Sequence, residues 1–175
     1  QVMYHAWVER AWRAGLRVMV NHGTNIAALC RVGQTYSGNP QADCNDMGVA
    51  TKQVEYLYDV QDYVDAQFGG PGKGWFRIVT SPAEARKVIN EGKLAVVLGI
   101  EISHLFNCGI KLGQNLCDEA EIDKQLDRLH ALGVRQMFPI HEFDNAFGGN
   151  GIFDGAVLNV GNFLDTGAFW KTYDC

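Results

Sequence analysis

Several common signatures are missing from this sequence, and each absence removes a class of function. No two cysteines stand in a Cys-x-x-Cys arrangement, which disfavours a structural zinc knuckle or a thioredoxin-like centre. The longest apolar runs, such as Leu94–Ile100, are far shorter than the ~20 residues that a membrane span requires. Neither a Gly-x-Gly-x-x-Gly loop after the first predicted strand nor a Walker loop is present, so a nucleotide-binding fold loses support.

Clustered positive charge is missing as well. The formal net charge is −5, and the nearest approach to a basic patch, Arg10, Arg13 and Arg17, falls across a short helix and its end. Nucleic-acid binding needs Lys and Arg gathered on one surface to neutralise phosphates. The sequence therefore predicts neither a nucleic-acid partner nor a membrane span.

The five cysteines suggest an oxidising compartment. Four of them lie in segments rich in Gly, Asn or Gln between predicted elements, where disulfides are common in secreted proteins. The close pairs Cys30/Cys44 and Cys108/Cys117 are the preferred bridges, although the sequence does not fix their connectivity. Cys175 is left over, and we expect its partner outside this segment. These features predict a secreted or extracellular protein.

Hydrophobic periodicity and turn residues predict alternating helices and strands. Ser81-Pro82-Ala83-Glu84 is the clearest helix start, with Ser as the N-cap, Pro at the first helical position and Glu placed to reach back. The segment Asn21–Asn25 caps the first strand, and a loop follows it through about Asp43. The tail after Phe147 gives no firm prediction. Helices are predicted at Met3–Ala14, Asp46–Phe68, Ser81–Glu91 and Glu119–Leu132, and strands at Leu16–Val20, Phe76–Val79, Leu94–Ile100 and Val134–Ile140.

This alternation predicts an α/β fold with a parallel sheet. The run Leu94–Ile100 is almost continuously apolar, as expected for a strand that is buried on both faces. Doubly wound sheets and barrels both satisfy the pattern. Length and composition, with 47% hydrophobic and 20% charged residues, fit one globular domain over residues 1–175.

Ionisable residues follow three of the predicted strands. In parallel α/β folds the carboxyl ends of the strands carry the active site, so these residues are candidates for chemistry. Glu101 ends a buried strand and needs a partner or a metal to offset its burial. Each candidate also has a structural interpretation, such as a rim ion pair for Glu101, a backbone-bound ring for His141, turn chemistry for His22 and an Asx-turn for Asp144 or Asn145. The full set is Asn21, His22, Glu101, His104, His141, Glu142, Asp144 and Asn145.

Two segments resemble the membrane-dipeptidase-like (renal dipeptidase) family of metal-dependent hydrolases. Gly92–His104, with Glu101-Ile102-Ser103-His104 at its end, is similar to the strand that ends in Glu-Gly-Gly-His in that family. Leu129–His141 is similar to the family's next unit, Leu-Gly-x-Arg followed by five residues and His. Asp144-Asn145-Ala146-Phe147 resembles the Asn-containing loop that comes after that histidine. The resemblance spans about residues 76–149.

The resemblance implies a parallel (β/α) barrel of the TIM type, incomplete in this segment, that cleaves a small peptide or amide bond with a metal-activated water. Glu101 would be the carboxylate that bridges two divalent metals, most often zinc, and His141 would contact the substrate near the scissile bond. Asn145 would join His141 in the catalytic loop, with His22, His104 and Asp144 on the active-site face.

The sequence also departs from the family pattern. No His-x-Asp occurs in the chain, no histidine follows His141, and Ile102-Ser103 stands where the family has Gly-Gly. A whole barrel needs about 250 residues. We therefore expect an internal segment of a longer domain, with an incomplete metal site and no activity on its own.

Two other functions stay open. One is a glycoside hydrolase that uses Glu101 and Glu142, which would require carboxyl groups roughly 5–5.5 Å apart for retention or 6.5–9.5 Å for inversion. The other is a non-catalytic extracellular binding module derived from the same fold, which bulky Ile102 and the missing ligands favour.

Overall fold

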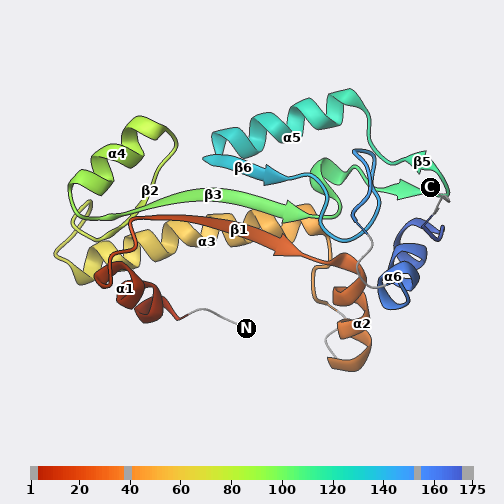
Figure 1. The fold of residues 1–175 in the computed structure, drawn as a ribbon, viewed down its shortest axis with the longest axis horizontal. Coiled ribbons are helices and arrows are strands. Elements are labelled where there is room, and N and C mark those ends of the chain that lie inside the picture. The colour runs from red at the N-terminus through yellow and green to blue at the C-terminus, as the bar shows by residue number, and fades with distance from the viewer. Residues whose placement is uncertain (1–3, 38–40, 152–154, 171–175) are drawn as a thin grey trace.

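A parallel sheet of four strands forms the centre of the molecule (Figure 1). The computed structural model describes residues 4–37, 41–151 and 155–170. The strands of this sheet are β1 (Val18–Asn25), β2 (Phe76–Ile78), β3 (Leu94–Ile102) and β6 (Val134–Phe138). The α/β fold with a parallel sheet that the sequence predicts is confirmed.

Strand β3 is the centre of the sheet because it pairs with the other three strands. Along one edge it pairs with β1 over eight residues, from Val18↔Ala95 to Asn25↔Ile102. On the opposite edge β2 pairs with Leu94–Val96 and β6 pairs with residues from Leu98 to Glu101. The described residues therefore form an open sheet in which β1 is an edge strand, and not a closed barrel.

Helices surround this sheet, and the longest of them covers one of its faces. Alternate residues of β3 (Leu94, Val96, Leu98, Ile100 and Ile102) are fully buried in the core that includes Val54 and Leu57 of α3. Gly23 brings β1 close to α3, since a Cβ there would lie 2.5 Å from the carbonyl oxygen of Ala50. The helices are α1 (His5–Arg13), α2 (Ala27–Ser37), α3 (Asp46–Gln67), α4 (Pro82–Asn90), α5 (Glu119–Ala131) and α6 (Val157–Thr166).

The predicted start of α4 is confirmed, with one change in detail. Ser81 accepts a hydrogen bond from the N–H of Glu84 (3.2 Å), and Pro82 opens the helix. The Glu84 carboxylate reaches back to the N–H of Thr80 (2.7 Å), one residue before the N-cap. These bonds satisfy donors that the first turn of a helix leaves free.

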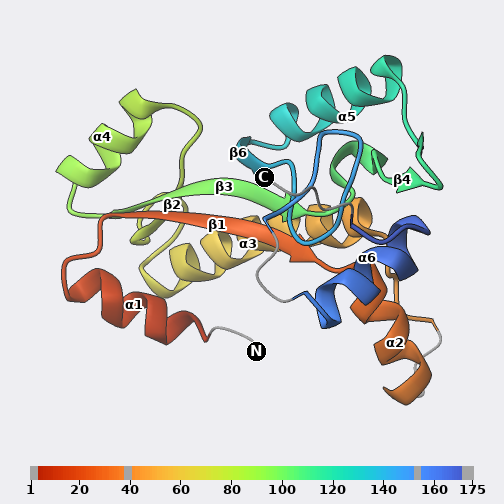
Figure 2. The same ribbon diagram turned by 45° about the vertical axis from the view of Figure 1, so that its right-hand side comes forward.

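Two helices were not predicted from the sequence. The segment after Ile26, predicted as loop, contains α2, which the Cys30–Cys44 disulfide ties to the segment before α3. Residues 157–166, for which the sequence gave no firm prediction, form α6. Gly161 lets this helix approach Phe143, two of whose ring atoms lie 2.7 and 2.8 Å from where a Cβ would be. Figure 2 shows α6 beside α2 at the carboxyl end of β1.

Both preferred disulfides are confirmed. Cys30 bonds Cys44, with Cα atoms 5.5 Å apart, and Cys108 bonds Cys117, with Cα atoms 4.8 Å apart. The second bridge encloses a short hairpin of β4 (Ile110–Lys111) and β5 (Gln114–Asn115), which follows a 3₁₀ turn at Leu105–Asn107. Cys175 lies outside the described residues. Within the described part of the chain, no helix has the length and apolar character needed to cross a membrane.

Candidate functional site

Three candidate residues from three parts of the sequence meet at the carboxyl end of the sheet. His22 lies in β1, Glu101 near the end of β3, and His141 three residues after β6. The register pairs His22 with Gly99 and Glu101 with Thr24, so both side chains project from the sheet face opposite α3. This face is open to solvent along β1, where Val18 and Val20 are 47% and 48% exposed.

The Glu101 cluster (Glu101, His22 and His141) has one imidazole on each carboxylate oxygen. His141 Nδ1 lies 3.0 Å from Oε1, and His22 Nδ1 lies 3.2 Å from Oε2. The remaining nitrogen of His22 is in short contact with the side-chain amide of Gln136 on β6. Gly99 makes this arrangement possible, because a Cβ at that position would overlap the His22 ring.

Glu101 is held in its ionised form. Partial burial acts to raise the pKa of Glu101, but the hydrogen bonds to His141 and His22 outweigh it, and the pKa lies below its ordinary value. The side chains of His141, His22 and Glu101 are 20%, 23% and 31% exposed, so solvent reaches the cluster. The site is therefore an anionic carboxylate that orients two imidazoles at an open surface.

His104 belongs to a second cluster and not to the first. Its Nε2 lies 2.7 Å from Asp165 of α6, and its Nδ1 forms an ion pair at 3.2 Å with Asp46, the first residue of α3. The hydrogen bond to Asp165 and the contact with Asp46 raise the pKa of His104 to about 9, against burial, which acts to lower it. We call these three residues the His104 cluster.

The predicted loop residues after β6 are engaged in structure. Asn145 is 1% exposed, and its Nδ2 donates to the carbonyls of Ser103 (2.8 Å) and Pro139 (2.5 Å). The backbone N–H and carboxylate of Asp144 bond the Asn162 side chain of α6. These residues shape the loop that carries His141, and the structure does not bring them into the Glu101 cluster.

Glu142 makes its hydrogen bond to Ser103 and none to Glu101. Its backbone N–H donates to the hydroxyl of Ser103, and its Oε2 is buried without a hydrogen-bond partner among the described residues. No hydrogen bond joins Glu142 to the Glu101 cluster. The pairing of Glu101 with Glu142 that a glycosidase would need gains no support from these contacts.

The described residues do not fit the two-metal centre that the family resemblance implies. No group of three or more His, Cys, Asp or Glu side chains in that part of the chain is arranged to hold a metal ion. Around Glu101, both carboxylate oxygens are already engaged by imidazole nitrogens. The donor set there is one carboxylate and two imidazoles, whereas the family uses about five ligands.

Sequence reasoning missed three residues that complete these clusters. Gln136 lies within β6, two residues before Phe138, which pairs with Glu101. Because residues two apart on a strand share a face, this spacing could have placed Gln136 on the face of Glu101. Asp46 and Asp165 gave no signal, because one was read as a helix start and the other falls in the tail that gave no firm prediction. Asp46 is 1% exposed. Carboxylates at the start of a helix are usually exposed, so the sequence gave no reason to expect this burial.

No protein-family model, curated protein or solved structure matches this chain. The dipeptidase-like relationship therefore stays a prediction from the sequence. The function has to be argued from the geometry of the site.

Proposed function

We propose that the Glu101 cluster is part of the active site of a hydrolase that cleaves a small peptide or amide bond. The observation that supports this is the convergence of one ionised carboxylate and two imidazoles at the open carboxyl end of a parallel sheet. Active sites of parallel α/β proteins gather at this end. A carboxylate whose pKa is perturbed by specific partners in such a position is a candidate for a functional site.

His141 is the residue best placed to move a proton. Its Nδ1 is held by Glu101, and its other ring nitrogen has no hydrogen-bond partner among the described residues. A carboxylate that accepts from Nδ1–H fixes the tautomer in which Nε2 can take a proton from water. His141 would then activate the attacking water as a general base and return the proton to the leaving amine.

His22 is a positioning residue in this scheme. It holds the second oxygen of Glu101 and is itself fixed by Gln136, so the carboxylate is anchored from two sides. The Nε2 atom of His22 meets the side-chain amide of Gln136, whose oxygen and nitrogen exchange places on a 180° turn and so can match either ring tautomer. His22 therefore limits the rotation of Glu101 and, through it, of His141.

The proposal needs only the open sheet. The closed barrel and the zinc dependence that the resemblance implies are separate proposals. No step of the mechanism above depends on a metal. Two disulfides in a chain of this size also support our proposal that the protein is secreted or extracellular.

A dipeptide and N-acyl amino acid panel tests the function. We expect His141→Gln to lower turnover by about 10²–10⁴-fold, the usual contribution of a general base, and His130→Gln, on the exposed side of α5, to leave it unchanged. The assay is run before and after dialysis against a chelator, with elemental analysis of the wild type and Glu101→Gln. Activity that survives chelation supports the imidazole route, and activity that is lost and restored by zinc supports the metal-dependent route. An inactive wild type under both conditions would sink the imidazole route, which needs no residue outside this chain, and would favour the binding module or the incomplete segment that the sequence predicts.

A further inference from the structure

Two asparagines hold the loop that follows β6, one deep in the fold and one at the surface. The amide of Asn145 is 1% exposed and donates to the carbonyls of Ser103 and Pro139. Asn150 is exposed, and its amide nitrogen Nδ2 donates to the backbone carbonyl of His141 (2.7 Å). This outer hydrogen bond therefore joins the end of the loop directly to the proposed general base.

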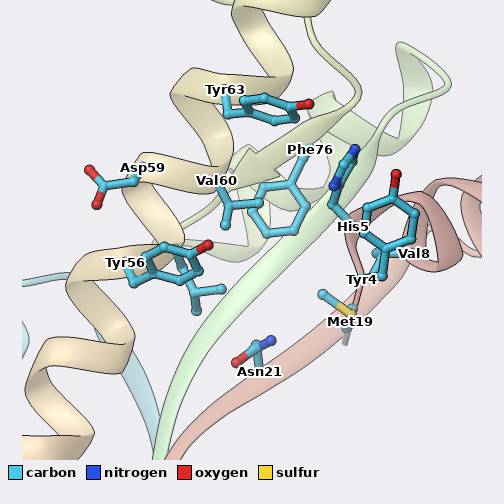
Figure 3. Close-up of a pocket in the computed structure, with 11 residues that line it drawn as sticks. Tyr4, His5, Val8, Met19, Asn21, Tyr56, Asp59, Val60, Tyr63 and Phe76 are labelled. Carbon is cyan, nitrogen blue, oxygen red and sulfur yellow. The ribbon is translucent and has the colours of Figure 1, made fainter. Parts of the chain in front are cut away.

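The hydrogen bonds of His141 come from its own side of the sheet. A cavity of about 690 Å³ lies on the α3 side, between α1, β1 and α3 (Figure 3). The Glu101 cluster projects from the opposite face, so the residues that line this cavity do not support it. Among the described residues, His141 is hydrogen-bonded through its ring to Glu101 and through its carbonyl to Asn150. A change at Asn150 therefore removes one of these two restraints.

Asn150 and Gly151 form the one Asn-Gly pair in the sequence. The side-chain amide of an asparagine is open to attack by the backbone nitrogen of the next residue, and Gly has no Cβ to obstruct that approach. The Gly151 nitrogen donates to Oδ1 of Asn150 at 2.8 Å, and because a C=O bond is ~1.2 Å long, this nitrogen lies within about 4 Å of Cγ. Both residues are exposed, so water and base reach the pair.

We propose that Asn150 is a site of spontaneous deamidation and that this modification releases His141. In the first step the Gly151 nitrogen gives its proton to a base and forms a bond to Cγ of Asn150, while Nδ2 takes up a proton and leaves as ammonia. The product is a five-membered succinimide. One water then adds to either of its two carbonyls and opens the ring to aspartate or isoaspartate. No electrons are transferred, and water is the co-reactant.

The atom that leaves in this reaction is the atom that holds His141. Nδ2 donates to the His141 carbonyl, and the carboxylate that replaces the amide has no hydrogen to donate. An ionised oxygen then faces a carbonyl oxygen, and the two repel each other. The isoaspartate product also adds a carbon to the backbone of the loop. A loss of turnover rests on the proposed function, whereas the modification and the movement of His141 do not.

Ageing of the purified protein at mildly alkaline pH, followed by peptide mapping with mass spectrometry, tests the modification. Gly151→Ala is the matched variant: a Cβ added there meets no atom within 4 Å, so the methyl group fits the fold and obstructs ring closure. We expect Asn150 to be modified well before Asn115, which is also exposed but precedes Leu116. In Gly151→Ala the modification should be several times slower, and in the wild type it should slow at acidic pH, where the Gly151 nitrogen keeps its proton.

Two substitutions of Asn150 test the consequence for His141. Asn150→Asp removes the donor and adds the charge, whereas Asn150→Gln keeps an amide donor. We expect Asn150→Asp to lower kcat by about 10–100-fold with little change in KM, since misplacing a catalytic group by ~1 Å can cost 10²-fold, and Asn150→Gln to retain most of the activity. The NMR signal of the His141 ring should shift in Asn150→Asp and in aged wild type, and stay in place in aged Gly151→Ala.

Two results would overturn the inference. If Asn150 is modified no faster than Asn115, it is not a deamidation site. If modified wild type keeps the His141 ring signal of the fresh protein, the lost hydrogen bond does not position His141, and this readout needs no variant that might fail to fold. A wild type without turnover would contradict the proposed function instead, and peptide mapping and the His141 signal would still decide the inference.

Discussion

The Glu101 cluster and the His104 cluster lie at the same end of the sheet and use the same side chains in opposite proportions. In the first, one carboxylate serves two imidazoles and all three side chains are 20–31% exposed. In the second, one imidazole serves two carboxylates, and the side chains of Asp46 and Asp165 are 0% and 2% exposed. The carboxylate of the first cluster is therefore open to solvent, whereas both carboxylates of the second are enclosed and only its imidazole, 22% exposed, reaches solvent.

This difference supports the proposal of chemistry at the Glu101 cluster and a structural role for the His104 cluster. His104 connects the start of α3, the segment after β3 and α6, three elements far apart in the sequence. Asn25 adds a hydrogen bond of 2.8 Å to Asp46 from the end of β1. A partly exposed histidine between two buried carboxylates joins these elements. Sequence proximity to Glu101 therefore did not make His104 part of the same site.

The sharpest test of the comparison is His104→Ala. It leaves two buried carboxylates without their cation, and breaking a buried ion pair in this way costs about 3–5 kcal/mol. We expect the free energy of unfolding, measured by urea titration, to fall by that amount. His130→Ala, on the exposed side of α5, is the control and should change little. A loss below about 1 kcal/mol for His104→Ala would show that the His104 cluster is not a structural tie.

The pH dependence of stability should follow from His104. Its pKa in the folded protein is raised to about 9, above the ordinary value of 6.5. The stabilisation is therefore fully present below about pH 6.5 and is lost as the pH rises through about 9. We expect the unfolding free energy to fall by about 2 kcal/mol across this window, and the fall to disappear in His104→Gln. A wild type equally stable at pH 6 and pH 9.5 would contradict the prediction.

The smallest effect on stability is expected for Glu101→Gln. Water can replace the lost partners of both histidines because the cluster is partly exposed, so the cost should stay within about 1 kcal/mol. The stabilisation that Glu101 contributes has the opposite pH dependence. Because the pKa of Glu101 is lowered in the folded protein, this stabilisation is present above about pH 4.5 and is lost as the pH falls further. Thermal unfolding of this variant together with the turnover assay checks both points. If Glu101→Gln lost as much stability as His104→Ala, the two clusters would not differ in their contribution to the fold.

Much of the architecture was predictable because its signals are local. The apolar run of β3, the N-cap of α4 and the 3.6-residue period of α3 all depend on neighbouring residues. β1 was predicted too short, since Asn21–Asn25 reads as a polar turn. In the structure these residues continue the strand, because β3 supplies a partner for each of them.

The candidate site was predictable in part. His22, Glu101 and His141 follow from the rule that strand ends converge, although His22 proved to lie inside β1. The roles of Asn145 and Asp144 could not be separated from that of His141 by sequence, because all three follow the same strand. What distinguishes them is burial: the polar atoms of Asn145 are used by backbone groups of two other segments. Such long-range contacts leave no local pattern.

Both disulfides border the end of the sheet that carries the two clusters, one tying α2 to the segment before α3 and the other enclosing the β4–β5 hairpin. The thiol–disulfide balance of the surroundings therefore acts on that end and spares the opposite end, where α4 and the start of β3 contain no cysteine. In a reducing cytoplasm the end of the sheet that carries the two clusters loses two covalent constraints. Material produced there and material produced in an oxidising compartment would be two different samples of the same polypeptide, and free-thiol titration before any assay tells them apart.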